Sequence, residues 1–230
     1  MPPRPSKNKK AIVLLSGGMD STVSLYWAQR RGWICYALSF DYGQRHKKEL
    51  RSAARVARLA GIPHQTVRLS LPWGGSALTD ARKPLPHHAE KNILKGPIPS
   101  TYVPARNTVF LSFALSWADQ LGAEAIVIGA NAIDYSGYPD CRLPYLRAFE
   151  RVSNLGTRLG SETKKKISIL APLVHLTKAD IVRLGLKLNA PMEATWSCYQ
   201  GGRTPCGRCD ACLLRERGFK SVLAKKKGRT

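Results

Sequence analysis

The sequence predicts an α/β protein with a doubly wound, mostly parallel sheet. Three observations lead to this class: short apolar runs alternate with helical patterns, polar turns rich in Gly and Ser join them, and 43% of the residues are hydrophobic. Strands separated by helices pair in parallel, because each crossover helix returns the chain to the same end of the sheet. A chain of 230 residues is long enough for one such core and a small appendage.

The first elements alternate along the N-terminal part of the chain. AIVLL (11–15) is a continuous apolar run typical of a buried strand, and residues 20–31 form a helical pattern that stops before a glycine. ICYALSF (34–40) predicts a second strand, and the basic, amphipathic KKELRSAARVARLAG (47–61) predicts a second helix. HQTVRLSL (64–71) alternates apolar and polar residues, which predicts a half-buried third strand.

The same alternation returns in the C-terminal half. ARNTVFLSFALSWADQLG (105–122) predicts a largely buried helix, and AEAIVIGAN (123–131) is a strong strand pattern. Residues 144–160 form one further helical pattern, and KISILAPL (166–173) predicts a fifth strand. The segment 177–189 predicts a helix that begins with a threonine cap.

We expect four parts in the chain. A basic tail (1–10) precedes a nucleotide-binding α/β domain (11–190), which is followed by a helical, metal-binding segment (191–223) and a second basic tail (224–230). The Pro- and Gly-rich segment 72–104 predicts a long functional or mobile loop within the domain.

The net charge is strongly positive, at +22 from 37 Lys and Arg against 15 Asp and Glu. Residues 1–10 and 220–230 hold nine of these cations and no acid, which leaves +13 in the body. A basic body favours an anionic partner, which would be a nucleotide, RNA bound without sequence preference (non-specific nucleic-acid binding) or an acidic protein. A generally basic proteome or a salt-adapted surface explains the charge equally well, because no aromatic-rich RNA motif accompanies it.

Membrane insertion is not expected. The longest apolar stretch, VFLSFALSWA, is too short and too interrupted by serine to span a bilayer. The basic N-terminal residues are followed by an apolar run of only five residues, unlike a secretory signal. We therefore expect a soluble, cytoplasmic protein without a membrane partner.

The segment SGGMDST (16–22) follows the first predicted strand, where sheets of this kind bind their ligands. Its glycines let backbone N–H groups approach an anion, and the helix that follows turns its positive end to the same place. An ordinary strand-to-helix turn is the alternative. The loop contains no lysine and so differs from the pattern G-x-x-x-x-G-K-[ST]. Asp20 would repel a phosphate, and we expect it to cap the helix or to bind Mg²⁺.

Four cysteines predict a metal site near the C-terminus. Cys198, Cys206, Cys209 and Cys212 have the spacing C-x7-C-x2-C-x2-C, which can close a tetrahedral Zn²⁺ shell. Such a shell leaves no open position for water, so the metal would be structural. An iron–sulfur cluster and free thiols are the alternatives, although the ferredoxin pattern needs a further C-x3-C-P.

Polar loops after the other strands offer further candidate residues. Arg106, at the start of a helix, suits a phosphate or carboxylate, or else a local salt bridge. Lys178 opposes its own helix dipole and is expected to face an anion or solvent. The loop NAIDYSGYPDCR (131–142) offers carboxylates for the N–H groups of a guanine-like edge, tyrosines for stacking and an arginine for a substrate carboxylate. Its candidates are Asp134, Tyr135, Ser136, Tyr138, Asp140 and Arg142.

Seven segments, taken together and in order, resemble the QueC family of the PP-loop ATP pyrophosphatases, which have an adenine nucleotide alpha hydrolase-like fold. They are SGGMDST, FDYGQRH, TYVPARNTVFLS, GANAIDYSGYPDCR, LTKADIV, TWSCY and PCGRCDAC. The resemblance covers about residues 11–219, and Met19 stands where family members often have Gln.

The resemblance implies conversion of 7-carboxy-7-deazaguanine, ammonia and ATP to a 7-cyano base on the route to queuosine or archaeosine. The carboxylate would form an acyl adenylate, ammonia would displace AMP, and a second ATP would activate the amide towards the nitrile. It also implies small-molecule substrates, Mg²⁺ with the ATP, a homo-oligomer, and catalytic roles for Asp20, Arg106 and Lys178. The implied ATP-binding residues are Leu15, Ser16, Gly17, Gly18, Met19, Asp20, Ser21, Thr22, Val23, Ser24 and Leu25.

Two other functions remain open at this point. A PP-loop enzyme that modifies tRNA directly, by thiolation or as a lysidine-type ligase, would use the basic body. A QueC-like module recruited to modify another macromolecule is the third possibility. A non-enzymatic RNA-binding protein would leave SGGMDST without a purpose.

Overall fold

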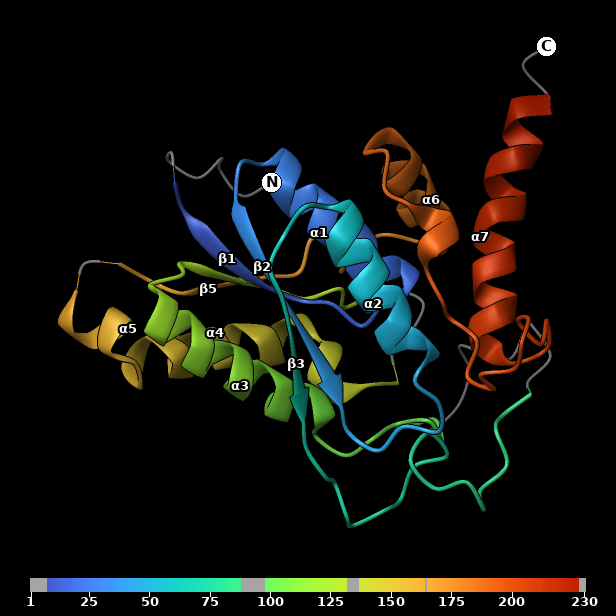
Figure 1. Ribbon diagram of the computed structural model, residues 1–230, viewed down its shortest axis with the longest axis horizontal. Coiled ribbons are helices and arrows are strands. Elements are labelled where there is room, and N and C mark those ends of the chain that lie inside the picture. The colour runs from blue at the N-terminus through green and yellow to red at the C-terminus, as the bar shows by residue number, and fades with distance from the viewer. Residues whose placement is uncertain (1–7, 88–97, 132–136, 164, 228–230) are drawn as a thin grey trace.

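The computed structural model describes residues 8–87, 98–131, 137–163 and 165–227. Within them, five strands form one entirely parallel sheet in the order β3-β2-β1-β4-β5 (Figure 1). The predicted doubly wound α/β class is therefore confirmed. The strands are β1 (Lys10–Leu14), β2 (Ile34–Asp41), β3 (His64–Arg68), β4 (Ala125–Val127) and β5 (Ser168–Leu170).

Helices cover both faces of the sheet, with α1 and α2 on one side and α3, α4 and α5 on the other (Figure 1). Helices α6 and α7 lie beside the first layer and pack against each other. The α-helices are α1 (Met19–Arg30), α2 (Lys48–Leu59), α3 (Arg106–Leu121), α4 (Leu143–Leu155), α5 (Arg158–Glu162), α6 (Lys178–Lys187) and α7 (Asp210–Lys227). Two short 3-10 helices are η2 (Pro139–Cys141) and η3 (Met192–Ala194).

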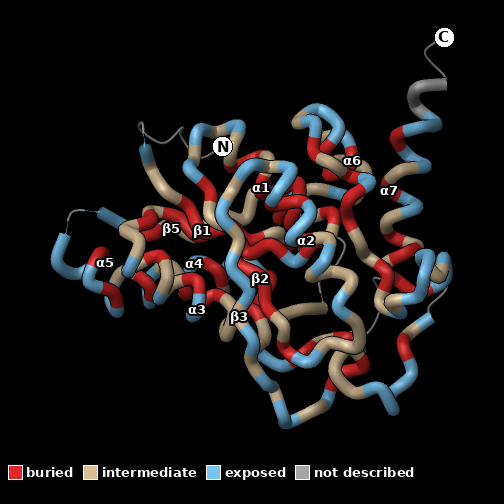
Figure 2. Tube along the Cα trace, in the orientation of Figure 1, coloured by how far each residue is buried: buried red, intermediate tan, exposed pale blue. Residues whose placement is uncertain are grey.

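The core has two layers because side chains alternate across each strand. In β1, Ile12 and Leu14 point to the layer of α3 and α4, while Ala11 and Val13 point to the layer of α1 and α2. All four are buried, and Figure 2 shows the buried segments concentrated along the central strands. The apolar run AIVLL thus covers both faces of a central strand, as its unbroken hydrophobicity predicts.

Two predicted elements have different boundaries in the structure. The single helix expected over 144–160 is broken at Gly156, and α5 begins after Thr157, whose side chain accepts a hydrogen bond from the Gly160 N–H. Helix α7 continues to Lys227, beyond the point at which we expected a basic tail. Phe219 and Val222 contribute to the cluster that α7 shares with α6, and the helix continues past this packing to Lys227.

Among the described helices, none has the length and apolarity that crossing a membrane requires.

Candidate active site

A cavity of about 310 Å³ lies at the carboxyl ends of β1, β2 and β4. Residues from the loop after β1, the loop after β2, the starts of α3 and α6, and the C-terminal segment line it. This is the place at which open α/β sheets bind ligands, and all three catalytic candidates reach it. They are Asp20, Arg106 and Lys178.

The loop after β1 packs closely on α2. Gly17 has φ +83°, and a Cβ atom built on it would lie 2.1 Å from the Glu49 backbone oxygen and 2.6 Å from the Ala53 backbone nitrogen. Hydrogen bonds within the loop also stabilise it. The Ser16 N–H donates to the Ser21 hydroxyl at 3.2 Å, and the Gly18 N–H donates to the Ser16 hydroxyl at 3.3 Å. A glycine in the left-handed region is what permits this turn.

Only part of the predicted ATP-binding run faces the cavity. The residues that line it are Leu15, Ser16, Gly18, Met19, Asp20 and Ser21. Gly17 instead packs against α2, as described above. Thr22, Val23, Ser24 and Leu25 are buried within α1 and support the loop from behind.

Asp20 and Lys178 form an ion pair inside the cavity. The Lys178 Nζ donates to Asp20 Oδ2 at 2.6 Å, so the anion that the lysine faces is a carboxylate of the protein itself. Asp20 does not cap α1, whose N-cap is Gly18 without a side-chain hydrogen bond, so that expectation is wrong. The other oxygen, Oδ1, is buried and has no hydrogen-bond partner within the described residues. An unsatisfied carboxylate oxygen at this place fits a ligand of Mg²⁺.

The threonine cap of α6 is confirmed and fixes Lys178. The Thr177 side chain accepts from the Asp180 N–H, and the Asp180 carboxylate accepts from the Thr177 N–H, which makes a capping box. Lys178 is the first residue of the helix and is therefore held at the edge of the cavity.

Arg106 is enclosed by aromatic rings. Its Nη1 donates to the Tyr42 hydroxyl at 3.3 Å, and its guanidinium lies 5.8 Å from the ring centroids of both Tyr42 and Phe110. Burial lowers the pKa of this group, but the hydroxyls of Tyr42 and Tyr138 raise it, so that the pKa lies above its usual value. Its Nε has no partner, and no carboxylate of the described residues lies within salt-bridge distance. A charged donor therefore faces the cavity.

The candidates in the loop 131–142 have separate positions. Tyr138 lines the cavity, and its hydroxyl lies 2.6 Å from Thr101 Oγ1. Asp140 is buried away from the cavity lining, where its Oδ2 accepts from the Asn107 N–H at 3.0 Å and satisfies the N-terminus of α3. Arg142 is exposed at the start of α4 and does not line the cavity. Asp134, Tyr135 and Ser136 lie outside the described residues.

Sequence reasoning missed several charged side chains of the cavity. Glu49 and Arg215 lie on helices whose polar residues indicated solvent exposure, yet both line it. Arg215 donates to Thr195 Oγ1 at 2.6 Å and to the Met192 carbonyl oxygen at 2.8 Å, and so ties α7 to the segment before the cysteines. The position of Glu49, shortly after FDYGQRH, is the one signal that pointed towards it.

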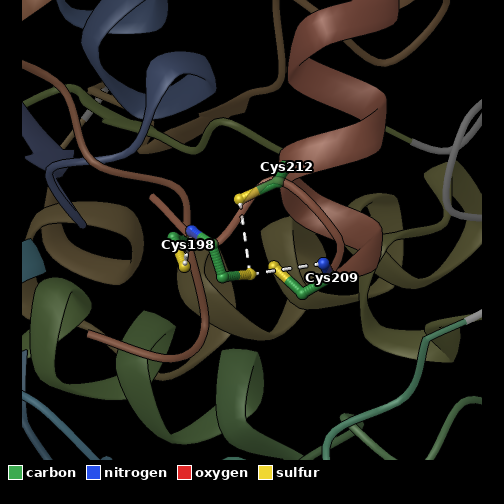
Figure 3. Close-up of side chains that lie close together, drawn as sticks. Cys198, Cys209 and Cys212 are labelled. Carbon is green, nitrogen blue, oxygen red and sulfur yellow. Dashed lines mark hydrogen bonds between the residues drawn. The ribbon is translucent and has the colours of Figure 1, made fainter. Parts of the chain in front are cut away.

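The four cysteines form a cluster, and Figure 3 labels three of them, Cys198, Cys209 and Cys212. Their neighbours Ser197, Tyr199 and Ala211 line the cavity. The four cysteine sulfur atoms all lie within 4.8 Å of one another, and the Cys206 and Cys212 sulfurs are 4.0 Å apart. A tetrahedral shell with Zn–S bonds of about 2.3 Å places its sulfurs about 3.8 Å apart. The N–H groups of Gln200 and Cys206 each donate to Cys198 Sγ at 3.4 Å, which suits a thiolate. The cluster therefore fits a closed metal site.

The cysteine segment is tied to the loop after β1. The Trp196 N–H donates to the Gly17 carbonyl oxygen at 2.9 Å, and the Lys48 Nζ lies 4.2 Å from the Trp196 ring centroid. The His46 Nε2 donates to the Cys198 carbonyl oxygen at 2.9 Å. These contacts hold the cysteine segment, the loop after β1 and the start of α2 together as one wall of the cavity.

Comparison with known proteins identifies one family and several similar relatives. The family model described as "Queuosine biosynthesis protein QueC" matches residues 10–223. A 7-cyano-7-deazaguanine synthase of Trichormus variabilis is 53% identical over 212 residues, covering 91% of this chain and 93% of the relative. A protein of the same name from Thermoplasma volcanium is 51% identical over 212 residues, covering 92% of this chain and 86% of the relative.

Solved structures include a more distant likeness. The structure of NMN synthetase from Francisella tularensis overlays with a TM-score of 0.49 at 16% identity, covering 87% of this chain and 71% of that chain. The family model spans both the SGGMDST loop and the four cysteines. The resemblance inferred from the seven segments is confirmed, and the chain belongs to the family of the queuosine biosynthesis protein QueC.

Proposed function

We propose that this chain is an ATP-dependent synthase that converts 7-carboxy-7-deazaguanine and ammonia to 7-cyano-7-deazaguanine through adenylated intermediates. The observation that carries the proposal is the lysine-free SGGMDST loop, which opens onto a cavity holding the Asp20–Lys178 pair, in a member of the QueC family. The close relatives named above carry the name of this activity. The substrates are small molecules, and the expected homo-oligomer follows from the family resemblance alone.

The residues have distinct tasks in this reaction. Backbone N–H groups of the loop 16–21 and the N-terminus of α1 bind the pyrophosphate of ATP. Mg²⁺, held in part by the free Oδ1 of Asp20, supplies charge neutralisation when it is bound. Lys178 and Arg106 place positive charge where the leaving phosphates become more negative, and fixed cations stabilise developing charge most effectively.

Zn²⁺ has a structural task in this proposal. A four-thiolate shell offers no open coordination position, so Cys198, Cys206, Cys209 and Cys212 would hold the metal away from the chemistry. The bound metal fixes the segment that contacts the loop after β1 through Trp196.

An assay without RNA tests the function directly. Purified protein, 7-carboxy-7-deazaguanine, an ammonium salt and Mg·ATP should give the nitrile, measured by mass spectrometry, together with AMP and pyrophosphate. Asp20→Asn should lower turnover about 100-fold or more, because it weakens both the metal ligand and the ion pair. Asp80→Asn, in a salt bridge with the exposed Arg82, is the matched control and should keep full turnover.

Two results would contradict the proposal. The first is ADP as the first-formed nucleotide product in a kinase-free preparation. The second is no reaction on the free base but ATP-dependent modification of added tRNA, which would favour the tRNA-modifying alternative. RNA binding alone decides nothing, since a basic surface binds phosphates without regard to sequence and loses affinity steeply with salt.

A further inference from the structure

Glu49 is an acidic side chain of the cavity that the mechanism above does not use. It lies in the first turn of α2 and lines the cavity together with Arg106 and Tyr42. Within the described part of the chain its carboxylate makes no hydrogen bond or ion pair, and the half-buried side chain is open to the cavity. Its backbone is fixed, because its carbonyl oxygen lies directly against Gly17.

The surroundings of this carboxylate are costly for a group without a partner. Burial raises the pKa of Glu49 to about 7, although the positive charge of Arg106 acts in the opposite direction. A ligand that fills the cavity would cover this carboxylate, and covering it without hydrogen-bond donors would be costly. The position of Glu49 in the cavity lining therefore indicates a ligand with N–H groups.

Next to Glu49 the cavity has a wall suited to a flat ring. The rings of Phe40 and Phe110 are stacked, with centroids 3.9 Å apart and planes at 3°. The Tyr42 ring meets Phe110 edge-on at 5.4 Å, and all three aromatic residues line the cavity. Aromatic faces of this kind bind planar heterocycles by stacking and burial.

We infer that the Glu49 carboxylate recognises the base of the substrate by accepting hydrogen bonds from the N1–H and 2-amino groups of its guanine ring. This inference rests on the proposed function. A guanine edge offers two neighbouring donors, and a carboxylate offers two acceptors at matching separation. The edge of adenine pairs one donor with one acceptor, and this acceptor repels the ionised carboxylate, which is the form that the two donors of a guanine edge stabilise. Glu49 therefore separates the base from the adenine of ATP.

Steady-state kinetics of Glu49→Gln test this assignment. The amide keeps one acceptor but turns an N–H₂ group towards the donors of the base, so KM for 7-carboxy-7-deazaguanine should rise about 10- to 100-fold. KM for ATP should stay within about twofold of the wild-type value. Glu49→Asp keeps the charge on a shorter side chain and should restore part of the loss. The matched control is Glu124→Gln. Glu124 binds Lys9 at the amino ends of β1 and β4, whereas the cavity lies at the carboxyl ends of the strands.

A substrate analogue that lacks the 2-amino group makes the test specific to recognition. The wild type should favour the natural base over the analogue by about tenfold or more, and Glu49→Gln should lose most of this preference. Equilibrium binding of both compounds without ATP, measured by calorimetry, gives a second readout, and thermal unfolding verifies that each variant is folded.

The outcomes separate the two proposals. A wild-type protein that makes no nitrile contradicts the proposed function. A wild-type protein that makes the nitrile, with a Glu49→Gln variant that keeps its preference for the 2-amino group, overturns the inference alone. A rise confined to KM for ATP also overturns it, because the carboxylate would then serve adenine or Mg²⁺.

Discussion

Gly17 shows how a single backbone position controls the conformation of the loop after β1. Its positive φ places the loop directly on the start of α2, where backbone atoms of Glu49 and Ala53 occupy the space of a side chain. Backbone atoms cannot move aside as the end of a flexible side chain can, so any Cβ at this position must displace the loop or the helix.

Gly17→Ala should therefore abolish ATP binding measured by calorimetry. Gly43→Ala is a matched control, because Gly43 has nearly the same φ, +82°, but nothing lies within 4 Å of its would-be Cβ. The control should lose only about 1–2 kcal/mol for the left-handed conformation and should keep its affinity for ATP. Normal ATP binding by Gly17→Ala would show that the loop is not a close-packed phosphate site.

The residues that sequence alone could predict are those with a local signal. The cysteine spacing, the Thr177 cap and the glycine loop can each be recognised from a few neighbouring residues of the sequence. Glu49 and Arg215 cannot, because their place in the cavity depends on distant segments of the chain that pack against them. Asp140 was expected to bind substrate, and its bond to the Asn107 N–H at the start of α3 could not be read from the sequence.

At the scale of elements, the C-terminal segment contacts the loop after β1 and restrains it. The cysteine cluster, the Trp196–Gly17 hydrogen bond and the packing of α7 on α6 connect residues at both ends of the chain. The order of strands and helices was predictable from periodicity. The break at Gly156 was not, because the Thr157 cap decides where α5 begins.

Cys209→Ala should remove the metal and strongly lower the unfolding temperature, since structural zinc contributes folding free energy directly. The measurements are elemental analysis, with about one Zn²⁺ per wild-type chain, and thermal unfolding. Cys35→Ala is the matched control, because Cys35 is equally buried but packs in the core between the sheet and α1–α2. Iron in the wild-type protein, or a metal-free Cys209→Ala variant of normal stability, would reject the zinc site.

At the scale of the whole molecule, the net positive charge is larger than the ligands of one small cavity would need. A net charge of +22 is far more than one ATP and one carboxylate require. Nine of the cations lie in residues 1–10 and 220–230, where Lys9 is bound to Glu124 and Lys220 to Glu216. The remaining terminal charges have no evident task in a reaction on a free base.

A chain that lacks residues 1–8 and 225–230 should keep its turnover on the free base within about twofold near physiological salt. This truncation retains the Lys9–Glu124 pair and the part of α7 that packs on α6. Its affinity for RNA should fall, because fewer cations neutralise phosphates. A large loss of turnover that added RNA restores would assign the charge a role in catalysis.

We expect the hydrogen bond from Trp196 to Gly17 to make nucleotide binding depend on the bound metal. A chain without its metal would lose the neighbour that holds the Gly17 carbonyl, and with it the shape of the phosphate site. Such a molecule would be an inactive member of the population and not a slower enzyme. In a zinc-starved cell, the supply of the modified base would then follow the fraction of chains that carry the metal. ATP binding by a folded but metal-free Cys209→Ala protein would break this connection.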